Sequence, residues 1–354
     1  MMSRTIFSIV LLALLLVLFF SVILTAGKPA HAQASFPFTE FDLALEATPD
    51  YPSPGQNVRF TVRSVLLNLA TSDITWYVNG AVVKEGAGLS EMDVVAGPLG
   101  SEKKVRVEVR GENEAVSVSG IIRPTEVELL WEADSYVPPF YRGRALPSAG
   151  SHVLFFALPR FQRPGASLIS PSDLLYTWRK NGKVIQSASG RGKHTVLLDS
   201  PVLFGSDVVS VEVSTADGEL RGLSSVRIAS VEPLLVLYEN HSLFGILYHR
   251  ALGNQVTIPE VEATFSAVPY FAPVKSPDSG SLLYKWRVNN FALDSNTTRP
   301  SAITINATGS SGRAFIELAL THATNFFMSA SGSWNVTLSN AEGINASDPF
   351  GSQP

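Results

Sequence analysis

The sequence predicts an all-β protein of three tandem β-sandwich domains after an N-terminal hydrophobic leader. Three observations predict this fold: a tryptophan-centred strand pattern that occurs three times, strands in which apolar and polar residues alternate, and turn residues between those strands. The chain has 354 residues, of which 45% are hydrophobic and 16% charged. A chain of this length and composition can bury several cores and is not disordered as a whole.

Residues 1–34 are expected to be a signal peptide or an N-terminal membrane anchor. A nearly unbroken apolar run spans residues 6–26 and is long enough to cross a bilayer. Ala30, Ala32 and Ala34 then form two overlapping A-x-A patterns of the kind that signal peptidase recognises. Both interpretations predict an exported protein, extracellular or in the cell envelope, whose contact with the membrane is through this segment only.

The strongest pattern is a strand that contains a tryptophan and ends in a tight turn. Trp76, Trp178 and Trp286 recur at intervals of about a hundred residues, which is the size of one sandwich domain. Each indole shares a strand face with the residue two positions before it, because side chains alternate along a strand. We therefore expect all three tryptophans in domain cores. Asn79-Gly80 and Asn181-Gly182 predict two-residue hairpins, because Asn and Gly tolerate positive φ.

This pattern places three domains at residues 35–122, 123–230 and 231–354. Downstream of each tryptophan an alternating strand is expected, at residues 103–109, 208–213 and 334–338. A final strand follows in the first two domains. In the third, only Ile344-Asn345-Ala346 and a polar tail follow, so the last strand there is expected to be weak or missing.

Strands that contain W-x-x-N-G and are followed by V-x-V-E-V resemble the Ig-like and PKD-like repeats of bacterial surface proteins. The resemblance covers three segments and most of the chain after the leader. It implies tandem Ig-like domains and a non-enzymatic role in adhesion, scaffolding or assembly at the cell envelope, sometimes beside pilus or secretion machinery. The chain contains no Cys, which also favours a bacterial or archaeal envelope over an animal extracellular protein, where disulfides are common.

Composition and motifs exclude several kinds of chemistry. The formal net charge of −4 argues against nucleic-acid binding, and the lack of Cys excludes thiol catalysis and thiolate metal sites. We find no linear motif of catalytic, cofactor-binding or metal-ligating residues and assign none. Two hypotheses stay open: a calcium site among the acidic residues at 126–134, and an extracellular hydrolase, because a carboxylate pair leaves no linear motif.

Two aromatic segments, at equivalent places in the second and third domains, are the candidate interaction loops. Aromatic residues and arginine dominate binding hot spots, and aromatic rings also stack on sugars. The expected partner is an envelope protein or a surface glycan. The competing hypotheses are a carbohydrate-binding module that uses the aromatic residues of these loops, and packing of the loops onto their own sandwiches. The candidate residues are Tyr136, Phe140, Tyr141, Arg144, Phe244, Tyr248 and Arg250.

Overall fold

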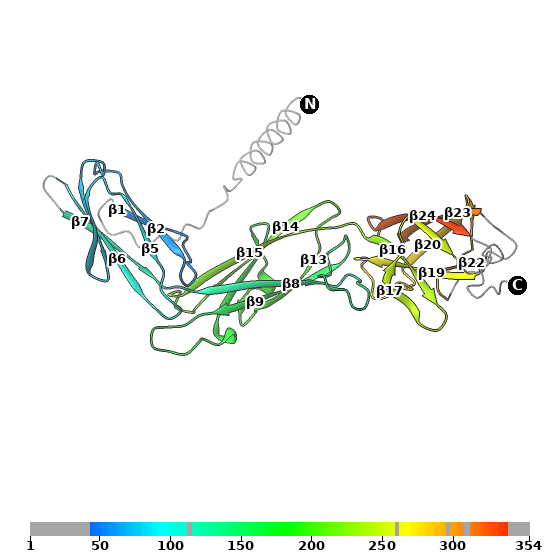
Figure 1. The fold of residues 1–354 in the computed structure, drawn as a ribbon. Coiled ribbons are helices and arrows are strands. Elements are labelled where there is room, and N and C mark those ends of the chain that lie inside the picture. Colours follow the sequence, from blue (N-terminus) through cyan, green and yellow to red (C-terminus); the bar gives the residue numbers. More distant parts are fainter. Residues whose placement is uncertain (1–42, 112–114, 259–261, 295–297, 307–311, 339–354) are drawn as a thin grey trace, which may run out of the picture. The chain divides into compact units, whose positions relative to one another are not determined.

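The computed structural model of the protein describes residues 43–111, 115–258, 262–294, 298–306 and 312–338 (Figure 1). The predicted leader and residues 344–346 lie outside the described residues. Within them, regular structure is almost entirely β-strand, and the helical elements are two short 3-10 turns, Pro171–Asp173 and Gln186–Ala188. The predicted fold class, tandem Ig-like β-sandwiches, is confirmed.

A search of the described residues for a helix long and apolar enough to span a membrane finds none.

The first repeat is built from two sheets with the strand orders β1-β2-β5 and β4-β3-β6-β7. Alternation explains how its strands are buried: Val105, Val107 and Val109 face inward and are fully buried, while the residues between them are not. Its strands are β1 (Leu43–Thr48), β2 (Asn57–Ser64), β3 (Asp73–Val78), β4 (Ala81–Ala87), β5 (Glu91–Val95), β6 (Lys103–Arg110) and β7 (Ala115–Ile122).

The second repeat has the same plan, with sheets β13-β9-β8 and β11-β10-β14-β15 and with β12 also paired to β10. Its core lies between the two sheets and includes Trp178, Tyr176 and Phe155. Its strands are β8 (Glu126–Ala133), β9 (His152–Arg160), β10 (Leu175–Lys180), β11 (Lys183–Val184), β12 (Gly190–Arg191), β13 (Thr195–Asp199), β14 (Ser206–Ser214) and β15 (Arg221–Ala229).

The third repeat carries additions to this plan. Its sheets have the orders β17-β16-β19-β22 and β18-β24-β23-β20-β21, and β18 pairs with β24 in the parallel sense. Its strands are β16 (Leu234–His241), β17 (Gly245–Ala251), β18 (Gln255–Ile258), β19 (Glu262–Tyr270), β20 (Leu282–Val288), β21 (Phe291–Ala292), β22 (Ala302–Asn306), β23 (Gly312–His322) and β24 (Ser329–Leu338).

The described residues gather into two compact units. One contains residues 43–50, 60–92 and 105–120 without the gap at 112–114, and the other contains the remaining described residues, including all of β8 to β24. The predicted division at residues 122 and 230 stays a prediction. The surface described below lies wholly within the second unit.

The three tryptophans occupy the same position in their sheets and are buried. Each indole N–H is also satisfied by a main-chain carbonyl 13 to 15 residues further along the chain. A buried indole needs such a partner, because an unpaired donor in the interior is costly. The Nε1–O distances are 2.7 Å for Trp76 to Leu89, 2.8 Å for Trp178 to Lys193 and 3.0 Å for Trp286 to Pro300.

The predicted Asn-Gly hairpins are confirmed. Asn79 and Gly80 have φ of 50° and 85°, and Asn181 and Gly182 have φ of 51° and 79°. Asn181 does more than turn the chain, since its Oδ1 accepts a hydrogen bond from the Val208 N–H at 2.8 Å. The turn residue thereby ties β10 to the neighbouring strand β14.

The expectation about the end of the third repeat is wrong. Residues 334–338 belong to β24, a ten-residue last strand, and are not the counterpart of the V-x-V strands. That counterpart is β23, which pairs with β20 as β14 pairs with β10. Its buried residues Ala314, Ile316, Leu318 and Leu320 alternate correctly. In the other repeats, the buried residues of the corresponding strand are valines. A prediction that looks for valine therefore does not find β23.

Candidate interaction surface

The segment that follows β8 packs against the third repeat. The Tyr136 N–H donates to the Ala272 carbonyl at 2.8 Å, and the Phe271 N–H donates to the Tyr136 carbonyl at 2.7 Å. The Tyr136 side chain also packs against the core of the third repeat. These contacts hold the start of the segment at the end of β19, where the next residues meet the second aromatic segment.

The second aromatic segment is a strand and the turn before it. β17 pairs with β16 in the antiparallel sense, with a register irregularity between Tyr238 and Asn240 (Figure 1). The turn at residues 241–245 places the ring of Phe244 at 4.8 Å from that of His241. The two segments therefore have different structures. The second segment contains β17, an extra strand on the sheet of the third repeat, whereas the first segment is not a strand.

Together the two segments line one groove with a volume of about 570 Å³. Four of the seven candidate residues, Phe140, Tyr141, Phe244 and Tyr248, take part in it. Tyr136 lies directly behind it and is hydrogen-bonded through its side chain to Tyr248. The other lining residues are Pro138, Pro139, Arg142, Ile246, Leu247, His249 and Tyr270. We call this site the aromatic groove.

Tyrosines joined by hydrogen bonds and ring contacts form the inner side of the aromatic groove. The hydroxyls of Tyr238 and Tyr270 are 2.6 Å apart, and the rings of Tyr141 and Tyr270 meet edge to face at 5.6 Å. Burial and the neighbouring Tyr248 raise the pKa of Tyr136, and burial and the hydrogen bond to Tyr238 raise the pKa of Tyr270. The surroundings of both residues thus favour the neutral phenol, which can donate a hydrogen bond.

The outer edge of the aromatic groove is apolar and exposed. Phe140 is 94% exposed, Phe244 is 76% exposed and Tyr141 is 37% exposed. Phe140 sits in a turn with φ of 65°, directly after two prolines that restrict the chain. Large apolar side chains gathered at one exposed place mark interaction sites, whereas single ones need no explanation.

The two candidate arginines, like Tyr136, lie outside the lining. The Arg144 guanidinium stacks over the Trp131 ring at 4.5 Å, which is a cation–π contact. Nη1 of Arg250 lies 3.8 Å from Oε2 of Glu239. Both arginines therefore have contacts within the protein, as the packing alternative expects. The prediction that they bind a partner stays untested.

Sequence reasoning missed Tyr270, which lines the groove from β19. It also missed Tyr238 of β16 and Phe271, which contact the lining tyrosines. Tyr270 and Phe271 end a strand, and their burial alone gives no sign of a binding role. One sequence signal could have identified them as surface residues. They directly follow the buried run of β19 at residues 265–269, at the point where the strand reaches the surface. The pairing of Tyr136 with Phe271 depends on tertiary structure.

Two of the four acidic residues at 126–134 have partners within the protein. Glu126 forms an ion pair with Arg160 at 2.9 Å, and Asp134 accepts a hydrogen bond from the His152 N–H at 2.7 Å. In the part of the chain that the structure describes, no three His, Asp or Glu side chains are grouped so that they could hold a metal ion.

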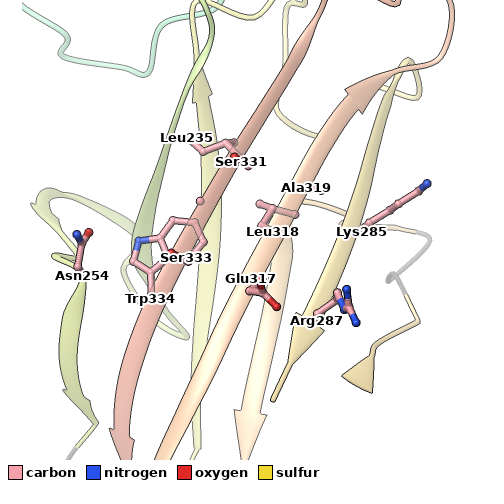
Figure 2. A pocket seen from close by; sticks show the side chains of 11 residues that line it. Leu235, Asn254, Lys285, Arg287, Glu317, Leu318, Ala319, Ser331, Ser333 and Trp334 are labelled. Carbon is pink, nitrogen blue, oxygen red and sulfur yellow. The ribbon is translucent and has the colours of Figure 1, made fainter. Parts of the chain in front are cut away.

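A second hollow of about 710 Å³ lies on the sheet of the third repeat that contains β20, β23 and β24. Figure 2 shows Lys285 and Arg287 on one side of it, Asn254 and Trp334 on the other, and Glu317 between them. Its floor includes the small residues of β24. No motif in the sequence points to this place.

Comparison with known proteins gives similarity in structure only. No family model and no curated protein sequence matches the chain. The chain is similar to three N-terminal domains of the bacteriophage RB49 highly immunogenic outer capsid protein, with 12% identity, a TM-score of 0.26 and coverage of 84% of this chain and 98% of that one. It is also similar to Sidekick-1 immunoglobulin domains 1–5, with 12% identity, a TM-score of 0.21 and coverage of 84% and 60%.

A third similar structure is SGBP-B of the Bacteroides ovatus mixed-linkage glucan utilization locus, in complex with a mixed-linkage heptasaccharide. It shows 13% identity, a TM-score of 0.23 and coverage of 85% of this chain and 71% of that one. The similar structures are multi-domain proteins of Ig-like and fibronectin III-like sandwiches. At these identities and TM-scores they add nothing about partners, so the function has to be argued from the surface of this chain.

Proposed function

We propose that the protein is an exported, non-enzymatic interaction and spacer protein of a bacterial cell envelope, in the manner of Ig-like and PKD-like surface repeats. In this proposal the sandwiches are the scaffold of a binding surface, and the aromatic groove of the third repeat is that surface. Loops on a rigid scaffold are where binding residues usually lie.

The observation that carries the proposal is that the two aromatic segments meet in one groove. They are separated by about a hundred residues, and yet Tyr141 from the first and Tyr248 from the second line the same hollow. A packing role alone would bury the apolar tips, but Phe140 and Phe244 stay exposed. Exposed aromatic side chains supported by buried ones are typical of binding hot spots.

A surface glycan is the second candidate partner, and the tyrosines favour it. Sugar rings stack on aromatic faces, while the hydroxyls of Tyr141, Tyr248 and Tyr270 offer hydrogen bonds at the same place. A glycan array tests this candidate with the full chain. Binding that disappears in the double variant Tyr141→Ala/Tyr248→Ala would support it, and an array without signal would exclude it.

The experiment that tests the proposal itself is binding of the full chain to isolated cell envelopes of the organism that makes it. Replacing the exposed tips, in the double variant Phe140→Ser/Phe244→Ser, should weaken binding by about tenfold or more, because two buried phenyl rings would be lost from the contact. The matched control is Phe204→Ser, since Phe204 of the second repeat is 79% exposed and lies outside the groove. Equal binding of both variants and the parent would refute the proposal.

A further inference from the structure

We propose that the aromatic groove docks onto the surface of an anionic lipid bilayer, with the tips of Phe140, Leu243 and Phe244 inserted among the lipids. This inference rests on the proposed function, because it names the partner that the aromatic groove contacts. It is carried by three properties of the site: apolar tips on turns, a layer of tyrosines behind them, and a cation beside them.

The apolar tips project on turns. Leu243 and Phe244 lie in the turn between β16 and β17 and are 83% and 76% exposed, and Phe140 lies in the turn after Pro138 and Pro139. The Tyr141 N–H closes this second turn on the Pro138 carbonyl at 3.2 Å. Side chains on such turns can insert among lipid acyl chains while the backbone stays outside the hydrocarbon. This matters because a bilayer interior offers no partner for open main-chain groups.

A layer of tyrosines stands behind the tips. Tyr141 is partly exposed, and Tyr248 and Tyr270 line the groove further in. Tyrosine is enriched at membrane–water interfaces, because its ring prefers the apolar side and its hydroxyl the wet side. From the tips inward, the protein presents first phenylalanine and leucine and then tyrosine. A bilayer presents first hydrocarbon and then headgroups from its interior outward, so the two orders match.

An unpaired cation lies beside the tips. Residues 136–149 and 241–251 include three arginines and no acidic residue, although the whole chain has a formal net charge of −4. Arg250 lies near Glu239 of β16, but Arg142 lines the groove itself, and within the described residues no carboxylate lies at salt-bridge distance from Arg142. Cations next to inserted apolar side chains attract anionic headgroups, by about 1 kcal/mol for each Lys or Arg near the surface.

This combination favours a bilayer over a folded protein or a sugar as the occupant. A protein partner would need matching pockets for three tips that stand on two separate turns, whereas lipid adapts its shape to them. A neutral sugar would use the tyrosine faces and would gain nothing from Leu243 or from the charge of Arg142. Protein and glycan are therefore alternative outcomes of the test.

The absence of Cys allows a clean experiment on the full chain. A single cysteine introduced as Leu243→Cys carries an environment-sensitive NBD fluorophore. The matched control is Val202→Cys, because Val202 is 78% exposed in a loop of the second repeat. Vesicles are phosphatidylcholine alone, or three parts phosphatidylcholine to one part phosphatidylglycerol. The leader is present in every protein, so its own affinity for vesicles is the same in all of them.

We expect NBD at position 243 to shift to the blue and brighten with the anionic vesicles, and to be quenched by lipids that carry a doxyl group on the acyl chain. NBD at position 202 should not change. Adding Phe140→Ser/Phe244→Ser should weaken the response by about tenfold or more. Adding Arg142→Glu should weaken it by about fivefold or more, and adding Arg227→Glu, an exposed arginine of the second repeat, should not.

Three results would overturn the inference: no change at position 243, the same change at positions 202 and 243, or a response at 243 that doxyl lipids do not quench. Failure here is distinct from failure of the proposed function. If envelopes from which lipid has been extracted still bind the parent and not the tip variant, the groove binds a protein or glycan, and only the lipid inference fails. If the tip variant binds whole envelopes like the parent, the proposed function fails.

Discussion

Replacement of Trp178 by alanine tests the architecture most directly. The side chain is fully buried between the sheets of the second repeat, and its Nε1–H donates to the Lys193 carbonyl at 2.8 Å. Truncation of a large aromatic side chain in a core costs about 3–5 kcal/mol. The compact unit that contains Trp178 also contains the third repeat, and a unit of that size loses about 2–4 °C in melting temperature per kcal/mol, so this unit should melt at least about 6 °C lower.

Calorimetry of the full chain measures this effect, because the two compact units are expected to unfold in separate transitions. Only one transition should move in Trp178→Ala. Trp178→Phe separates the contribution of the hydrogen bond from that of core packing. It keeps an aromatic ring in the core and leaves the Lys193 carbonyl without its donor, at a cost of about 1–3 kcal/mol. Val202→Ala, at an exposed position of the same repeat, should change stability by less than about 0.5 kcal/mol. A parent-like melting curve for Trp178→Ala would refute the assignment of the indole to a core.

Three further substitutions test local features. Burial raises the pKa of Tyr176 from 10.0 to about 12. The folded state therefore holds this proton more tightly, and the stability of the parent should fall as the pH rises from about 10 to about 12, whereas Tyr176→Phe should remove that part of the fall in alkaline denaturation. Asn181→Ala should lower stability by about 0.5–1.5 kcal/mol in urea unfolding, because the exposed Val208 N–H exchanges its side-chain acceptor for water; an unchanged midpoint would contradict this. Gly332→Ala should lower stability by about 1–3 kcal/mol, because its Cβ would overlap the buried Trp334 ring; a fully stable variant would show that the ring can move at no cost.

Much of the fold could be predicted because it depends on local rules that are repeated. Alternation of side chains marks the strands, and Asn-Gly marks the hairpins at residues 79–80 and 181–182. The failure at β23 has the same origin, since the interpretation matched residue types rather than alternation. Ala314, Ile316, Leu318 and Leu320 keep the period of two that burial requires, although none of them is valine.

The candidate site could be predicted only in part, because a sequence lists residues and does not say which surfaces meet. The aromatic segments were found by composition, and Phe140, Tyr141, Phe244 and Tyr248 do line one groove. Their meeting depends on the pairing of Tyr136 with Phe271 and Ala272, which no local pattern encodes. The structure also separates Arg144 and Arg250 from the lining, because nearby Trp131 and Glu239 offer them contacts.

The differences between the repeats indicate where function resides. The sandwich plan and the indole–carbonyl bond occur three times, so they explain stability and cannot by themselves explain a single binding surface. β17 is different, because in the described part of the chain neither of the other repeats has a strand paired to its first strand on the outer side. β17 contributes no residue to the core cluster of the third repeat, and Phe244, directly before it, stays exposed in the groove. Core substitutions should therefore change melting without changing binding, and substitutions at the tips should do the reverse.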